Sequence, residues 1–236
     1  MSLDQPDKPA APREPLLFLH TSIVATIAVC ATLFVLQRYV LSDGANAAMT
    51  YYLAFIPARI AMAGQGFLFV STALTCSLLH ASFAHLAVNM VWLAAFGAPL
   101  AQRIGALRFG AFWAFTALCA TALHFATHIG DASPLVGASG VVSGAMGAAA
   151  RFGFVTEDKA GPRAFAGAPL PLGLALRSRS VITFLLVWAL INYVSGAGMA
   201  PVGGSGGQIA WEAHIGGFLA GFLGLKLFDI PTAVRS

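Results

Sequence analysis

The segment that decides the fold is LVGASGVVSGAMGAAARFGFV, residues 135–155. Glycine and alanine are its commonest residues, so it is less hydrophobic than the other long apolar stretches of the chain. Small residues let helix backbones approach each other closely. We therefore predict a helix here that is enclosed by other helices.

The composition indicates that these helices lie in a membrane. Of the 236 residues, 58% are hydrophobic and 9% are charged, and the mean hydropathy is +0.80. A soluble globular domain carries about 25% charged residues. The net charge is +4, but there is no basic run with interleaved aromatic residues, so we expect a lipid bilayer and no nucleic acid as partner.

Five further stretches are long and apolar enough, or nearly so, to cross a bilayer, which takes about 20 residues. They are residues 16–36, 82–100, 109–129, 180–194 and 209–228. Together with residues 135–155 they predict an all-α membrane domain of six transmembrane helices over residues 16–228. We expect residues 1–15 to be a disordered cytoplasmic leader and residues 229–236 a short cytoplasmic tail.

The basic residues support this count of six. With both termini in the cytoplasm, eleven of the thirteen Lys and Arg residues fall in cytoplasmic segments, and only Arg38 and Arg59 lie outside them. This asymmetry follows the positive-inside rule. Without the span at 135–155, the basic loops on its two sides could not both be cytoplasmic.

Two outer connections differ in character. Residues 42–79 are mostly apolar but are interrupted by glycine and proline, and the run 67–79 is too short to cross. We expect a structured loop partly sunk in the bilayer. Residues 195–208, SGAGMAPVGGSGGQ, contain six glycines and predict a flexible connection that gates substrate access together with the fifth span.

Polar residues within spans are costly, which makes them functional candidates. His80, His85 and Asn89 lie at the outer end of the second predicted span, Ser139 near the start of the fourth, and His214 near the outer end of the sixth. The predicted topology places all of them in the outer half of the membrane.

Small residues form matching faces on the fourth and sixth predicted spans. They are Gly140, Ser143, Gly144 and Gly147 in the fourth, and Gly217 and Gly221 in the sixth. Since His214 shares a face with Gly217 and Gly221, a tight crossing would bring it to Ser139. His85 and Asn89 are four residues apart and also share one helix face.

A serine beside a histidine suggests nucleophilic catalysis. His214 could remove the proton of Ser139, because imidazole titrates in the required range. The backbone N–H of Ser139 and the side chains of Asn89 and His85 are candidate donors to an oxyanion. No acidic residue lies at the depth needed to orient His214, and Glu212 is on a different helix face, so we predict a dyad.

His124 and His128 are a second pair of histidines four residues apart. Such a pair could bind a metal ion. The sequence offers no matching carboxylate or thiolate, and we expect a polar packing or pore-facing role instead.

Three motifs together resemble those of the rhomboid protease family, in order and in span position. They are HxxxxHxxxN at residues 80–89, GASG at 137–140 and AHxxGxxxG at 213–221. The resemblance covers about residues 16–228. It implies a six-helix bundle with a water-filled cavity that opens outward, a Ser139–His214 dyad, cleavage of transmembrane protein substrates near their outer ends, and no metal or cofactor. It also suggests a multi-pass protein of a bacterial inner membrane.

Some features often found in the family are absent here. There is no Trp-Arg pair in the first outer loop, Ala101 stands about where an acidic residue is common, and Ser143 stands where an aromatic residue is common. None of these absences removes the predicted dyad. An alternative function is that of a catalytically inactive rhomboid-like protein that binds transmembrane segments. A small transporter would require inverted repeats or a charged midplane site, and the sequence has neither. We expect no obligate partner chain.

Overall fold

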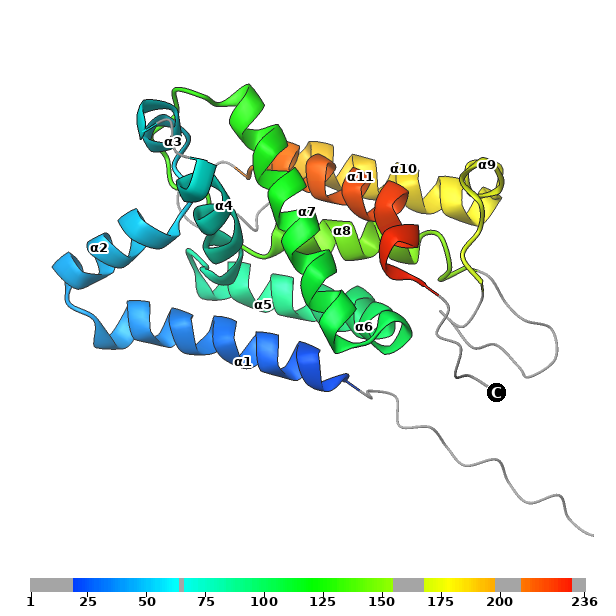
Figure 1. Ribbon diagram of the computed structural model, residues 1–236, viewed down its shortest axis with the longest axis horizontal. Helices are drawn as coiled ribbons and strands as arrows, with labels where there is room; N and C mark the ends of the chain where they lie inside the picture. Colours follow the sequence, from blue (N-terminus) through cyan, green and yellow to red (C-terminus); the bar gives the residue numbers. More distant parts are fainter. Residues whose placement is uncertain (1–18, 64–65, 155–167, 198–208, 231–236) are drawn as a thin grey trace, which may run out of the picture.

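The computed structural model describes residues 19–63, 66–154, 168–197 and 209–230. They form an all-α bundle, with an isolated bridge between Phe55 and Leu135 and no strand in these ranges (Figure 1). The helices are α1 (Thr21–Val35), α2 (Asp43–Leu53), α3 (Pro57–Ala63), α4 (Gly66–Thr75), α5 (Phe83–Trp92), α6 (Ala98–Ile104), α7 (Ala106–Thr127), α8 (Ser139–Ala149), α9 (Leu172–Ala175), α10 (Arg179–Gly196) and α11 (Trp211–Phe228). Short π-helical turns extend α1 to Val40 and join α5 to α6.

Among the described residues, four continuous helical segments are long and apolar enough to cross a membrane. They are Thr21–Val40, Phe83–Ile104, Ala106–Thr127 and Arg179–Gly196. These segments correspond to the first, second, third and fifth spans expected from the sequence. The chain is therefore a multi-pass all-α membrane protein.

The count of six spans is not confirmed. Helix α8 has only 11 residues, which makes it about 16 Å long against a hydrocarbon core of about 30 Å. Helix α11 has 18 residues but includes Glu212 and Lys226. Both helices contact protein along most of their length, so neither must match the bilayer as a lipid-facing helix does.

Helix α8 is the centre of the bundle, as its small residues predict. Nine of its eleven residues are buried. Figure 1 shows it between α5 and α11, with α7 crossing over it. A Cβ at Gly217 or Gly221 of α11 would overlap the backbone carbonyl of Gly140 or Gly144 of α8. The close crossing of α8 and α11 therefore depends on glycine at these positions.

The described residues of the connection, 42–63 and 66–79, are structured, as expected. They include helices α2, α3 and α4, and α4 is too short to cross the membrane. Paired backbone hydrogen bonds between Phe55 and Leu135 tie this connection to the segment that leads into α8. The Gly137 N–H also donates to the Cys76 carbonyl at 2.9 Å. The loop thus holds the chain just before Ser139.

Basic residues link several helices at the end of the bundle that lies away from Ser139. Arg103 forms an ion pair with Asp229 at 2.9 Å, and Arg108 donates to the Ile230 carbonyl at 2.7 Å. Arg151, which is 1% exposed, donates to the carbonyls of Leu170 and Phe222. These contacts link α6, α7, α8 and α11 where α8 ends. The expected leader at 1–15, most of the glycine-rich connection at 195–208 and most of the tail lie outside the described residues.

Candidate active site

Ser139 is the first residue of α8, as the sequence predicts. The N-cap residue Ala138 offers no side-chain cap, so within the described residues no side chain accepts from the free N–H groups of the first helical turn. Gly137 precedes it with φ of +125°, a conformation that favours glycine. A Cβ at Gly137 would lie 2.7 Å from the ring of His85. The backbone and His85 therefore fit closely together beside the serine.

The crossing of α8 and α11 brings the elements of Ser139 and His214 together. A Cβ at Gly140, next to Ser139, would lie 3.5 Å from the carbonyl oxygen of Ala213, next to His214. The hydrogen bonds of the described residues do not include one between the two side chains themselves. A Cβ at Gly137 would lie 3.8 Å from Ser139 Oγ as well as close to the His85 ring, so His85 and Ser139 lie on the same side of Gly137.

His214 has a hydrogen-bond partner that the sequence analysis missed. Its Nδ1 lies 2.7 Å from Oδ1 of Asn192 on α10, and Asn192 Nδ2 donates to the Trp211 carbonyl at 3.2 Å. A carbonyl only accepts, so the Asn192 amide nitrogen must face Trp211 and its oxygen must face His214. Nδ1 of His214 is then the protonated nitrogen, and Nε2 keeps a free lone pair.

The sequence did contain a signal for Asn192. It is a polar residue within the apolar run VITFLLVWALINYV, and polar groups inside a span are functional candidates. Asn192 is 6% exposed on a helix whose other buried residue is Val181. The sequence analysis sought only an acidic residue to orient His214, whereas in the structure the amide of Asn192 contacts its ring. The Ser139–His214 dyad stays a prediction.

His85 and Asn89 share a face of α5, but their contacts differ. The His85 ring contacts Gly137 and lies 5.2 Å from the His80 ring. Asn89 is buried and donates through Nδ2 to the His85 carbonyl at 3.0 Å. One of the two amide hydrogens of Asn89 is thus used within its own helix.

Two cavities adjoin this region. A small one of about 20 Å³ touches Ser139, Gly137 and Ala213, which is room for a single water molecule. A larger one of about 240 Å³ lies between the end of α1, α2 and the segments before α5 and α8. Its lining includes Arg38, His80 and Val136. His80 is buried, and neither of its ring nitrogens has a protein partner in the described part of the chain.

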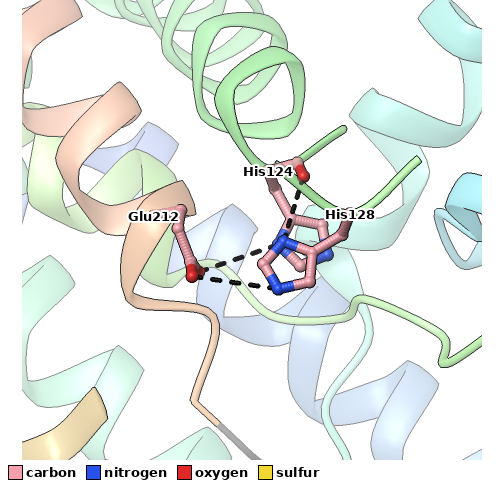
Figure 2. A group of neighbouring side chains, drawn as sticks. All are labelled: His124, His128 and Glu212. Atoms are coloured by element: carbon pink, nitrogen blue, oxygen red, sulfur yellow. Dashed lines mark hydrogen bonds and ion pairs between the residues drawn. The ribbon is translucent and has the colours of Figure 1, made fainter. Parts of the chain in front are cut away.

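His124 and His128 also have a partner that was not expected. Figure 2 shows both rings, from the end of α7, pointing toward Glu212 in the first turn of α11. The His128 Nε2 lies 3.8 Å from Glu212 Oε1, and the His124 Nδ1 lies 4.0 Å from Oε2. The statement that these histidines lack a matching carboxylate is therefore wrong. Glu212 and His214 have different partners, which agrees with the expectation that they lie on different faces of their helix.

Comparisons with known proteins agree with this fold. Residues 68–228 match the Rhomboid domain family. The chain is also 28% identical over 159 residues to RHOMBOID-like protein 5 of Arabidopsis thaliana, covering 67% of this chain and 44% of that protein. The chain thus spans less than half the length of this relative. Since the family match covers well over half of the sequence, the chain belongs to the rhomboid family.

Proposed function

We propose that this chain is an intramembrane serine endopeptidase with Ser139 as nucleophile and His214 as general base. The observation that carries the proposal is the Asn192–His214 hydrogen bond of 2.7 Å, beside the crossing of α8 and α11. It leaves the basic nitrogen of His214 free and fixes the ring. A base held by a third group next to a nucleophile is the arrangement that activates serine in hydrolases.

In the proposed reaction His214 Nε2 removes the proton of Ser139 as Oγ attacks the carbonyl carbon of the scissile peptide bond. The imidazolium that forms is stabilised by its Nδ1–H donating to Asn192 Oδ1. His214 then protonates the leaving amine, and the peptide bond breaks to give an acyl-enzyme. A water molecule, deprotonated by His214, hydrolyses the ester and regenerates Ser139.

The negative charge of the tetrahedral intermediate needs donors at the start of α8. In the part of the chain that the structure describes, the N–H groups of its first turn have no side-chain cap, and a helix N-terminus favours negative charge. The His85 ring lies against Gly137 on the same side. With Asn89 these groups form the proposed oxyanion site, in which one donor lowers the barrier by about 3 kcal/mol.

The proposed substrates are transmembrane segments of other membrane proteins, cut near their outer ends. The proposed setting is a bacterial inner membrane with both termini of the chain in the cytoplasm. The rival function is an inactive family member that binds transmembrane segments without cutting them. It would require neither a free base at His214 nor the partner that fixes its ring.

Labelling with a fluorophosphonate serine-hydrolase probe separates the two functions. The probe should label the purified chain, and Ser139→Ala should abolish the label. Ser139→Ala and His214→Ala should each abolish cleavage of a transmembrane substrate, and the double variant should be no worse, since members of one catalytic unit are not additive. Cleavage by Ser139→Ala at the full rate would overturn the proposal in favour of another nucleophile.

A further inference from the structure

The cluster of His124, His128 and Glu212 lies outside the proposed catalytic groups (Figure 2). One potential ligand atom from each residue lies within 4.8 Å of the others. His124 and Glu212 are buried, at 6% and 9% exposure. We propose that these three side chains form a binding site for a divalent transition-metal ion of the Zn²⁺ class.

The buried histidine points to a ligand. His124 Nδ1 has no hydrogen-bond partner within the described residues, although it is fully enclosed. Its distance of 4.0 Å from Glu212 Oε2 is too long for a hydrogen bond. Buried polar atoms are nearly always satisfied. A metal ion between these two atoms would satisfy both.

His128 already has the tautomer that leaves its Nε2 able to bind a metal ion. Its Nδ1 lies 2.8 Å from Thr127 Oγ1 and 3.3 Å from the His124 carbonyl. Because the Thr127 hydroxyl is within donating distance of two backbone carbonyls, Nδ1 of His128 carries the proton. Its Nε2 then has a free lone pair directed at Glu212. A metal-bound histidine commonly donates its other N–H to an oxygen in this way.

The spacing of the three groups fits a small metal ion after a modest closure. Two ligands at 2.0–2.1 Å from a tetrahedral ion are about 3.4 Å apart. The pairs of 3.8 and 4.0 Å, which involve the two different oxygens of Glu212, would close by about half an ångström. The widest pair of ligand atoms, which lies within 4.8 Å, would close further. The rings of His124 and His128 are stacked with centroids 4.5 Å apart, so ligation of one tetrahedral ion would also require the two rings to tilt apart.

The chemistry of the ligands selects the ion. Two imidazoles and one carboxylate suit Zn²⁺, Co²⁺ or Ni²⁺, whereas Mg²⁺ and Ca²⁺ prefer oxygen ligands. Asp131 lies in the loop after α7, and its backbone N–H donates to the His128 carbonyl at 2.9 Å. The Ser133 N–H donates to Asp131 and lowers the pKa of its carboxyl, which keeps it anionic. Its negative charge adds to the attraction for a cation.

The bound ion would join the end of α7 to the first turn of α11. Glu212 precedes His214 by two residues, so the bound ion would fix the start of the helix that carries the proposed base.

The proposed site is tested by metal binding and not by catalytic activity. Its test therefore does not depend on proteolysis, and either proposal can fail without the other.

The test is a Co²⁺ titration of the full chain in detergent, without a histidine tag, followed by visible absorption and by displacement with Zn²⁺. The wild type should bind one equivalent saturably, and Mg²⁺ should not compete. His128→Gln and Glu212→Gln should weaken binding by at least about 100-fold, since even residues that only orient a ligand change affinity by 10- to 100-fold. His20→Asn, which removes a histidine elsewhere and keeps an α1 N-cap residue, should bind as the wild type does.

Thermal unfolding gives a second measurement. Zn²⁺ should raise the Tm of the wild type and of His20→Asn, but not of Glu212→Gln, because an ion stabilises the state that binds it. His128 has 29% of its side chain exposed, so His128→Gln should still fold. If Co²⁺ and Zn²⁺ bind the wild type and the two cluster variants equally, or bind none of them, the cluster is only an ion pair between histidine and glutamate.

Discussion

The residues of the candidate site differ in whether they take part in the proposed reaction directly or through another residue. Ser139 and His214 are the reacting groups of the proposed reaction, whereas Asn192 acts through His214. The Asn192 amide is fixed at both ends, by the Trp211 carbonyl and by the His214 ring. Because a ring without this bond can rotate and change tautomer, the hydrogen bond makes Asn192 a positioning residue.

Asn192→Ala should lower kcat by about 10- to 100-fold, a part of the 10²- to 10⁴-fold that a positioned base contributes. KM should be unchanged, because Asn192 does not touch substrate in the proposed reaction. Asn192→Asp keeps the acceptor for His214 and should recover part of the rate. Steady-state kinetics on a transmembrane substrate measure both. Equal kcat in wild type and Asn192→Ala would show that the bond only helps packing.

Asn89→Ala should reduce the rate by one to two orders of magnitude, since one oxyanion donor is worth about 10²-fold or more. Labelling by the fluorophosphonate probe should persist, because the N–H groups of α8 remain. His85→Ala should slow the reaction and also lower the Tm, since its ring fills the space beside Gly137. If both variants cleave at the wild-type rate, these residues are packing groups and the oxyanion site lies elsewhere.

Among the elements, α8 and α11 are closely packed against each other, whereas α10 has little buried surface. The α8–α11 contact is backbone against backbone, and no flexible side chain lies between Gly217 and Gly140. Helix α10 instead exposes Leu186, Leu190 and Ile191 and buries only Val181 and Asn192. Its main aromatic contact with α11 is Trp188 stacked on Phe218, with centroids 4.1 Å apart.

Gly217→Ala should destabilise the protein by at least about 3 kcal/mol, the upper range for overpacking, because the new methyl group meets a backbone carbonyl. The matched control is Gly110→Ala in α7, where a Cβ meets nothing within 4 Å. That substitution should be neutral or stabilising by up to about 1 kcal/mol, since alanine favours helix. Thermal unfolding in detergent measures both. Equal Tm values for the two variants would contradict the close crossing.

Locking α10 to α11 should block cleavage of a transmembrane substrate if α10 moves to admit it. A Cβ at Gly196 would lie 3.0 Å from Cβ of Trp211, near the 3.5–4.5 Å of a disulfide. Gly196→Cys combined with Trp211→Cys should therefore cross-link on oxidation. The oxidised protein should lose substrate cleavage yet still react with the small fluorophosphonate probe. Equal cleavage before and after reduction would mean that substrates reach Ser139 by another route.

The whole molecule is organised around a helix that does not face lipid. α8 is enclosed, whereas α1 and α10 expose large apolar side chains such as Val29 and Leu186. Exposed apolar area of this extent marks a surface that is covered by another phase, here lipid. The basic contacts of Arg103, Arg108 and Arg151 all lie at the end of the bundle opposite Ser139. The orientation with both termini in the cytoplasm stays a prediction.

Thiol labelling tests whether α8 carries the chain across the membrane. Ser133 and Gly173 are exposed and lie on the two sides of α8 in the sequence. In intact cells a membrane-impermeant reagent should label Ser133→Cys, whereas Gly173→Cys should react only after permeabilisation. Background labelling of the three native cysteines is measured in the parent protein. Labelling of both positions from one side would reduce the number of spans.

Patterns within single segments determined the class of fold. Hydropathy identifies lipid-facing helices, and the small residues of 137–150 and 213–221 predict a close crossing, because each pattern is a property of one helix surface. The start of α8 at Ser139 and the contact of Gly217 with Gly140 agree with those predictions. The length of the apolar stretch at 135–155 did not predict the length of α8, since an enclosed helix need not match the thickness of the bilayer.

Contacts between separate helices required the tertiary structure. The partner of His214 is Asn192, 22 residues earlier on another helix, and the rotation of α10 about its axis decides whether that amide faces protein or lipid. Glu212 meets His124 and His128 only because the end of α7 packs against the first turn of α11. The sequence supplied each polar residue, but its neighbours depend on helix rotation and crossing, which are properties of the packed bundle.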